Sequence, residues 1–321
     1  MGGLGAGDEL NGDAVIQLAL EDPQLHRVLL DGLTEGVCMV DRDHRILYWN
    51  RAAERVSGYL AQEVAGQFSH GDLLMHCADD GSLLPGTISA AAAVLVDGEH
   101  RQSTVFLKHR DGYRLLVELE SRPIRDRDGA VVGALEVFEE AAVPPIHRRP
   151  PMESFGCSDS GTRAGTREYG EMRARHSLEA FDQFGIPFGW LRVGLDGAAE
   201  LDRGYGHAMV TAAVKMIAAT LDRNLAPRDV LSRWAADEFR VIVHGCSRSE
   251  LAAAAERLRL LVSTSTLEWW GDPLRITVSL GGAAVESGDT VESLEKRVGE
   301  VFEGCQAGGG DRSAVAHVGM R

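Results

Sequence analysis

The sequence predicts a two-domain α+β protein, with an antiparallel sheet in the N-terminal half and a mixed, α/β-type sheet in the C-terminal half. Before residue 141 the order of elements is two strands, helices and three strands, whereas strands and helices alternate after residue 165. The span 141–165 between them is rich in Pro, Gly, Ser and Arg and shows no periodicity. At 321 residues the chain is long enough for two separate cores.

The N-terminal half contains five strand-like runs. Gly36–Val40 and Arg45–Trp49 surround a short turn, and an amphipathic helix follows with Asn50 as its N-cap. An alanine-rich helix is expected within 87–99, and three alternating strands lie between 101 and 140, separated by the Asp-Gly turns RDG and RDRDG. This order predicts a five-stranded antiparallel sheet that cups a helical layer.

The C-terminal half alternates between helical and strand-like segments and includes one hairpin, which predicts a sheet flanked by helices. The expected elements are a helix over 167–185, a strand over 187–195, a helix over 207–225, a hairpin over 229–245, a helix over 248–265, a strand over 274–285 and a helix over 290–305.

Residues 25–140 resemble a PAS sensor domain, on the stretches DGLTEGVCMVDRDHRILYWNRAAERVSGY and LKHRDGYRLLVELESRPIRDRDGAVVGALEVFE. The resemblance implies a small ligand or cofactor between helices and sheet. His70, His76 and Cys77 are the candidates for cofactor contact, although histidines in a polar, Asp-flanked loop are more often solvated. The PAS ligand stays unidentified.

Residues 157–316 resemble the GGDEF domain of diguanylate cyclases, on YGH, SRWAADEFRVIV, AAERLRLLV and LRITVSLGGA. The resemblance implies a nucleotide-cyclase-like fold that condenses two GTP molecules into cyclic di-GMP with Mg²⁺, between two facing domains. The five-residue signature is degenerate here, because it reads Ala-Ala-Asp-Glu-Phe. The predicted organisation is an N-terminal extension at 1–24, a PAS domain at 25–140, a linker at 141–165 and a GGDEF domain at 166–318.

The metal and catalytic positions that the resemblance implies are only partly kept. Mg²⁺ takes oxygen ligands, usually including one or two carboxylates. The first family ligand is replaced by Gly194, which leaves Asp196 nearby and Asp237 from the signature as expected metal ligands. Asp237 and Glu238 are the remnant catalytic residues. The structural alternative is that both acids sit on an exposed turn before a core strand.

The positions that would read the nucleotide are also altered. Asp202 stands where the family has a base-reading Asn, and Thr211 stands where it has an Asp. Gln306 and Gly310 replace the Lys and Arg that hold the triphosphate. Charge neutralisation of the phosphates, on which phosphoryl transfer depends, is therefore expected to be weak.

The signature turn and the inhibitory product site show further losses. Ala235 and Ala236 replace glycines that approach the nucleotide, and a left-handed conformation there would cost each alanine about 1–2 kcal/mol. The product site keeps Asp229 but has Ala226 in place of its Arg. Both changes favour a site that has decayed.

Composition limits the partners. A formal net charge of −15 argues against bulk binding to nucleic acid or anionic membranes. The five cysteines are scattered without a C-x-x-C pair, and no apolar run approaches a membrane span, so we expect a cytoplasmic protein. The expected partners are a second copy of the chain, other signalling proteins and a small PAS ligand.

Three functions remain open from the sequence. The first is a PAS–GGDEF signalling protein that acts by binding and interaction. The second is a nucleotide cyclase with weak or altered activity that uses GTP and Mg²⁺, and the third is a regulator that holds GTP without turning it over. The Pro-rich linker replaces a helical connector and predicts two domains that move freely relative to each other.

Overall fold

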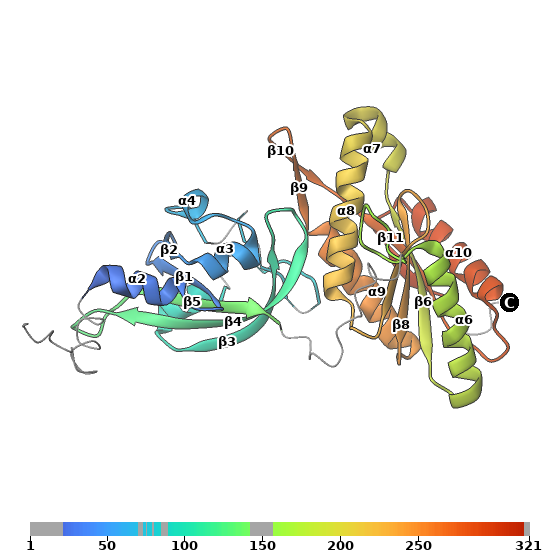
Figure 1. The fold of residues 1–321 in the computed structure, drawn as a ribbon, viewed down its shortest axis with the longest axis horizontal. Helices are drawn as coiled ribbons and strands as arrows, with labels where there is room; N and C mark the ends of the chain where they lie inside the picture. Colours follow the sequence, from blue (N-terminus) through green and yellow to red (C-terminus); the bar gives the residue numbers. More distant parts are fainter. Residues whose placement is uncertain are drawn as a thin grey trace, which may run out of the picture.

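The computed structural model describes residues 22–69, 73–74, 76–78, 80–84, 89–141 and 157–317. These residues form two lobes, one before residue 142 and one after residue 156 (Figure 1). The element order of each lobe follows the sequence-based prediction closely.

The first lobe is a five-stranded antiparallel sheet with helices, as predicted. Its strand order is β2-β1-β5-β4-β3. Asn50 lies at the predicted N-cap, where its side chain accepts from the backbone N–H of Ala53 (2.8 Å) and Val37 (2.9 Å). The strands are β1 (Gly36–Asp41), β2 (Ile46–Trp49), β3 (Arg101–Lys108), β4 (Arg114–Arg125) and β5 (Val131–Glu140), and the helices are α2 (Pro23–Asp31), α3 (Arg51–Ser57), α4 (Ala61–Val64) and α5 (Ala90–Asp97).

The second lobe is a mixed sheet flanked by helices. Its strand order is β12-β11-β6-β8-β7, with only the β11–β12 pair parallel. None of the helices in the described part of the chain combines the length and the hydropathy of a bilayer span. The strands are β6 (Phe188–Leu195), β7 (Val230–Arg233), β8 (Glu238–His244), β9 (Thr266–Trp269), β10 (Asp272–Arg275), β11 (Val278–Ala284) and β12 (Ser313–Val315), and the helices are α6 (Arg167–Phe184), α7 (Ala198–Tyr205), α8 (His207–Asn224), α9 (Arg248–Ser263) and α10 (Val291–Ala307).

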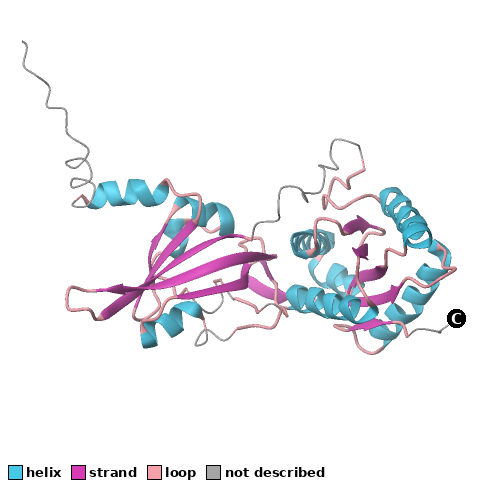
Figure 2. Cartoon of the chain, turned by 90° about the horizontal axis from the view of Figure 1, so that it is seen from below, coloured by secondary structure: helices cyan, strands magenta, loops and turns pink. Residues whose placement is uncertain are grey.

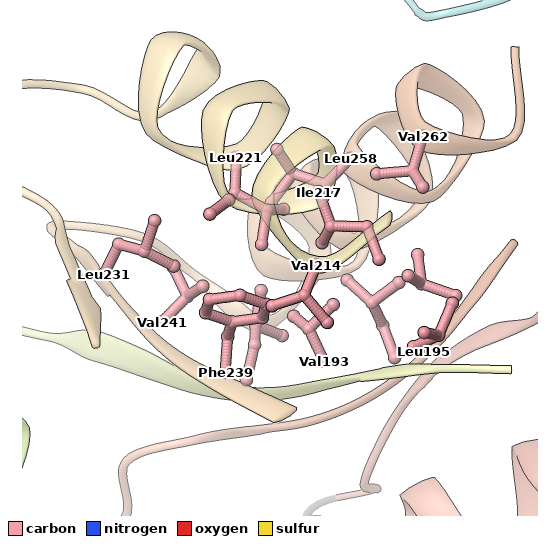
Figure 3. Packing of buried hydrophobic residues seen from close by; sticks show 14 of the residues in the cluster. Val193, Leu195, Val214, Ile217, Leu221, Leu231, Phe239, Val241, Leu258 and Val262 are labelled. Carbon is pink, nitrogen blue, oxygen red and sulfur yellow. The ribbon is translucent and has the colours of Figure 1, made fainter. Parts of the chain in front are cut away.

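The two faces of this sheet pack differently. Residues such as Val193 and Leu195 of β6 point toward α8 and α9, where they join the largest apolar core (Figure 3). Trp190 lies on the opposite face, in a smaller core with residues of α6 and α10. Since strand residues alternate between faces, Arg192 and Gly194 also belong to the α10 face. This face carries most of the residues discussed below.

The predicted strand over 274–285 is divided in the structure. Its first residues belong to β10, which pairs with β9 in a separate hairpin, and β11 begins only at Val278. The short helix α7 and strand β12 were not predicted, because each is too short to show a clear hydrophobic period. Helix α2 and strand β9 were not predicted either, whereas the other long elements lie close to where the sequence places them.

The two lobes, which the sequence predicts to move freely relative to each other, are in direct contact in this structure. The β3–β4 hairpin and strand β4 of the first lobe meet α8, α9 and β9 of the second (Figures 1 and 2). Asn224 of α8 donates to the backbone carbonyl of Arg114 (3.0 Å), for example. The composition of the linker says nothing of surfaces elsewhere in the chain, so this contact could not be read from it.

Candidate functional site

The signature residues form the turn between β7 and β8. The backbone N–H groups of Trp234 and Ala235 donate to the carbonyl of Glu238, at 2.9 and 3.3 Å. Neither Ala235 nor Ala236 is among the described non-glycine residues with positive φ. Arg233 donates to the carbonyls of both alanines, at 3.3 and 2.7 Å. The expected left-handed strain at the alanines is therefore absent, and the turn is a relaxed one held by Arg233.

An aromatic ring packs against Gly194, where the sequence predicts that the first metal carboxylate has been replaced. Gly194 lies in β6, paired with Glu238 of β8. A Cβ atom at Gly194 would lie 2.6 Å from the Cζ atom of Phe302, a buried residue of α10, and real Cβ contacts essentially never come closer than 3.0 Å. The guanidinium of Arg192 stacks on the same ring, 4.2 Å from its centroid. An aspartate at 194 would have to displace this stack.

Glu238 is held in an ion-pair network on the α10 face. Arg192 donates to both of its carboxylate oxygens (2.6 and 3.1 Å), and Arg240 donates to one of them (3.3 Å). Arg240 also binds both oxygens of Glu295 (2.9 and 3.0 Å), which accepts in turn from the indole of Trp190 (2.6 Å). Burial raises the pKa of Glu238, but the two arginines outweigh it and hold that pKa below its ordinary value. The remnant catalytic acid is thus part of the fold's internal support.

The carboxylate of Asp196 is also held by hydrogen bonds within the domain. Its carboxylate accepts from the hydroxyls of Thr277 (2.9 Å) and Ser279 (2.7 Å) and from the backbone N–H of Asp311 (2.7 Å). These bonds join the end of β6 to β11 and to the loop before β12. The structure therefore gives Asp196 a cross-linking role, whereas the sequence suggested a metal ligand.

Asp237 keeps an available carboxylate. Its backbone carbonyl accepts from Leu195 (3.0 Å), but its side chain makes no hydrogen bond or ion pair with another described residue. The described residues contain no group of three or more His, Cys, Asp or Glu side chains that could hold a metal. Since Mg²⁺ needs a near-octahedral oxygen shell, Asp237 and the engaged Asp196 do not fit it well.

The residues at the base-reading positions are solvated. Asp202 lies on α7 and faces His207, with 3.7 Å between a carboxylate oxygen and the ring Nδ1. Thr211 is exposed on α8. No described contact draws either of them toward the signature turn.

Gln306 and Gly310, which are predicted to replace two phosphate-binding cations, lie in different surroundings. Gln306 is exposed near the end of α10. Gly310 has a φ of 73°, and a Cβ atom there would lie 2.9 Å from the carboxylate carbon of Asp196. The following residue, Asp311, forms an ion pair with Arg259. An arginine at 310 is therefore opposed both by the backbone conformation and by Asp196.

Asp229, which was predicted for the inhibitory site, makes hydrogen bonds that stabilise the fold. One carboxylate oxygen accepts from the backbone N–H of His244 (3.0 Å) and the other from that of Ala226 (2.9 Å). The side chain is buried and closes the turn between α8 and β7. Ala226, at the position predicted to hold an Arg in the family, carries no cation, so the nearest cation in this turn is the exposed Arg228.

In the first lobe, His76 and Cys77 are both more enclosed than their polar loop suggests, and His70 lies outside the described residues. Burial, with a smaller effect of Arg114, lowers the pKa of His76 to about 4, so the ring is neutral at physiological pH. His76 borders a cavity of about 580 Å³ beside α5 and β3. Other residues that line it are Ser89, Arg101, Thr104, Val105 and Leu119.

Comparison with protein-family models divides the chain into two matches. Residues 24–140 match the model described as the PAS fold, and residues 158–312 match the model described as the diguanylate cyclase GGDEF domain. Both matches agree with the two lobes described above.

The chain is also similar to parts of two longer bacterial proteins. The chain is 25% identical over 262 residues to the probable diguanylate cyclase DgcE of Escherichia coli, covering 81% of this chain and 23% of that protein. It is 31% identical over 134 residues to the response regulator PleD of Caulobacter vibrioides, covering 41% of this chain and 29% of PleD. The chain thus spans less than a third of the length of these relatives.

Among solved structures, the diguanylate cyclase SiaD of Pseudomonas aeruginosa, solved in complex with its activator SiaC, matches with a TM-score of 0.50. The sequences are 20% identical, and the match covers 51% of this chain and 64% of SiaD. At this identity the similarity shows the fold of the second lobe and nothing finer.

Proposed function

Because the chain joins a PAS domain to a GGDEF domain of the diguanylate cyclase family, we propose that it is a cyclic di-GMP signalling protein whose GGDEF domain is catalytically inactive. In this proposal the domain acts by binding and interaction with other proteins. The observation that carries the proposal is Phe302, whose ring takes the space beside Gly194 that a metal-binding side chain would need.

The surrounding contacts support the same conclusion. Phosphoryl transfer depends on positioned metal ions and cations more than on covalent chemistry. Here Glu238 is neutralised by Arg192 and Arg240, and Asp196 has three donors of its own. The residues present do not fit the Mg²⁺ that the family generally uses, so we derive no catalytic step through a metal.

One observation favours a second candidate, a cyclase of weak or altered activity. Asp237 has a carboxylate without a described partner, and the turn that carries it is unstrained. A metal held by GTP itself would need only this one protein ligand. In that case Asp202 and Thr211 would set an altered base preference.

Incubation of the pure protein with GTP and Mg²⁺ or Mn²⁺, with products resolved by mass, decides between the two candidates. We expect no cyclic dinucleotide above a boiled control at micromolar protein. Time-dependent product that disappears in Asp237→Ala would overturn the proposal and support the second candidate.

A repair experiment tests the reason for inactivity. Gly194→Asp alone should not restore turnover, because Phe302 blocks the new side chain and the phosphate-binding cations are still missing. Active-site groups act as a unit, so a single repair has little effect without the others. Strong activity from Gly194→Asp alone would show that the rest of the site is intact.

A further inference from the structure

The two domains meet in a contact that we call the docked face. On the PAS side it comprises Cys77, Gly81, Phe106 and residues 112–116, and on the GGDEF side it comprises residues 223–224 of α8, 257–264 of α9 and Thr266. Figure 1 shows that this contact lies at the junction of the two lobes. The contact buries both polar and apolar groups.

Arg114 is the centre of the polar part. It is fully buried, with 0% of its surface exposed, although it is a charged residue at the start of β4. Its guanidinium donates to the backbone carbonyl of Thr264 in the GGDEF domain, and its own carbonyl accepts from Asn224 (3.0 Å). Burial of a guanidinium costs free energy unless the group is hydrogen-bonded. The bond to Thr264 therefore stabilises Arg114 when the two domains are docked.

Close packing surrounds this centre. Cys77 and Phe106 of the PAS domain form one apolar cluster with Leu261 of α9, and the Cys77 sulfur lies 3.5 Å from the Thr264 hydroxyl. At Gly112 the approach is so close that a Cβ atom would lie 2.5 Å from the carbonyl oxygen of Thr266. The two surfaces are complementary at the scale of single atoms, which is typical of a specific interface.

A third contact lies at the rim. Arg223 of α8 forms an ion pair with Glu140 at the end of β5 (2.6 Å) and stacks over the ring of Tyr113, 4.7 Å from its centroid. Tyr113 packs against the main apolar core of each domain. The β3–β4 hairpin therefore touches the interior of both domains at once.

We infer that the PAS domain is coupled to the GGDEF domain through the docked face, and that movement of the β3–β4 hairpin is transmitted directly to the ends of α8 and α9. Asn224 is two residues before Ala226, whose turn is closed by Asp229, and β7 then leads to the signature turn. A change at Arg114 thus reaches the remnant site through a short, packed segment. No helical connector is needed.

A disulfide trap tests whether the docked face exists in solution. In Thr264→Cys the new thiol would lie beside Cys77, and mild oxidation should link residues 77 and 264 in most molecules, as seen by non-reducing peptide mapping. Ala253→Cys is the matched control, because it lies exposed on the same helix about three turns away. Equal, low linking of Cys77 in both variants would overturn the inference.

Hydrogen exchange of the full chain tests the coupling itself. Arg114→Ala should speed exchange about tenfold in residues 220–226 and 257–264 of the GGDEF domain, because it removes the buried cross-domain hydrogen bond from the guanidinium to the carbonyl of Thr264. Asn224→Ala should act in reverse, on residues 106–116 of the PAS domain, because coupling between two sites is reciprocal. The control is Arg110→Ala, whose side chain pairs with Glu63 inside the PAS domain (2.9 Å).

The reciprocal design keeps the test decisive if Arg114→Ala disturbs the PAS fold on its own. Asn224→Ala changes only the GGDEF side, and its effect on the PAS hairpin cannot arise from PAS misfolding. Exchange changes confined to the mutated domain in both variants would contradict the coupling.

Discussion

Two regions of the molecule use polar side chains in opposite ways. At the signature end, Glu238 and Asp196 are both bound by donors from their own domain. At the docked face, Arg114 and Asn224 bind across the boundary between domains. In the first region the polar groups bind partners within their own domain, whereas in the second they bind the other domain.

The difference shows how a chain can engage the residues of a predicted site in its own fold. At Gly194 and Glu238, where the sequence predicts ligand contacts, the structure has arginines and an aromatic ring. The polar groups there are hydrogen-bonded within the domain, as enclosed polar groups usually are. Substitutions that remove these internal contacts should therefore lower the stability of the domain.

The largest effect is expected at Arg240, which is 4% exposed and pairs with both Glu238 and Glu295. Arg240→Ala would leave two acids without their shared cation and should lower the free energy of unfolding by about 3–5 kcal/mol. Asp237→Ala, in the same turn, should change it by less than about 0.5 kcal/mol. Urea denaturation measures both, and similar losses would mean that the network around Arg240 supports the fold no more than Asp237 does.

The PAS domain contains a buried acid, Glu136, whose pKa is shifted in the opposite direction to that of Glu238. Glu136 is 3% exposed between Cys38 of β1 and Ser121 of β4, and burial raises its pKa to about 7. A raised carboxyl pKa stabilises the folded state at low pH, and this contribution is lost as pH rises from about 4.5 to 7. Glu136→Gln should therefore raise stability at pH 8 by up to about 3 kcal/mol relative to its effect at pH 4.

Unfolding curves across this pH range check the sign. The ion-paired Glu238 has a lowered pKa, so its contribution is present above pH 4.5 and is lost on acidification below it. Glu238→Gln should accordingly show the reverse trend, with its cost shrinking in acid. The same pH trend in both variants would contradict the contrast between the two acids.

A smaller effect is expected at Gly194. Gly194→Asp forces a side chain against the buried ring of Phe302 and should cost about 1–3 kcal/mol, as overpacking usually does. Adding Phe302→Ala should remove the clash, so that the aspartate costs less in the double variant than in the single one. Independent, additive costs would show that the ring does not fill this position.

The smallest effect concerns the alanines of the signature. With negative φ at both positions, Ala236→Gly should destabilise the protein by about 0.5–1 kcal/mol through the greater freedom of glycine in the unfolded chain. If alanine were strained there, glycine would stabilise the protein instead. Thermal unfolding of the single variant against wild type distinguishes the two signs.

The sequence predicted the architecture well because both domains have strong, regular hydrophobic patterns and clear caps. Asn50 illustrates this, since its position before an amphipathic run is enough to identify a helix start. The predicted substitutions at the site were equally visible in the sequence, because each is a change of residue type at one position. The packing of Phe302 against Gly194 could not be predicted, since the two residues lie more than a hundred positions apart.

The docked face and the conformation of the signature turn also needed the structure. Whether Ala235 has positive φ depends on how the hairpin closes, which here is set by Arg233 and the carbonyl of Glu238. The burial of Arg114 depends on a surface of another domain. Only the alternation of Arg192 and Gly194 on one face of β6 hinted at the arginine network.

Manganese binding measured by electron paramagnetic resonance, with GTP present, tests the central claim most directly. The claim is that the family's metal position is filled by the chain's own side chains. We predict that wild-type protein lowers the free Mn²⁺ signal no more than Asp237→Ala does. Stoichiometric binding by the wild type that is lost in Asp237→Ala would contradict the claim, and would show that a working metal site remains at the signature turn.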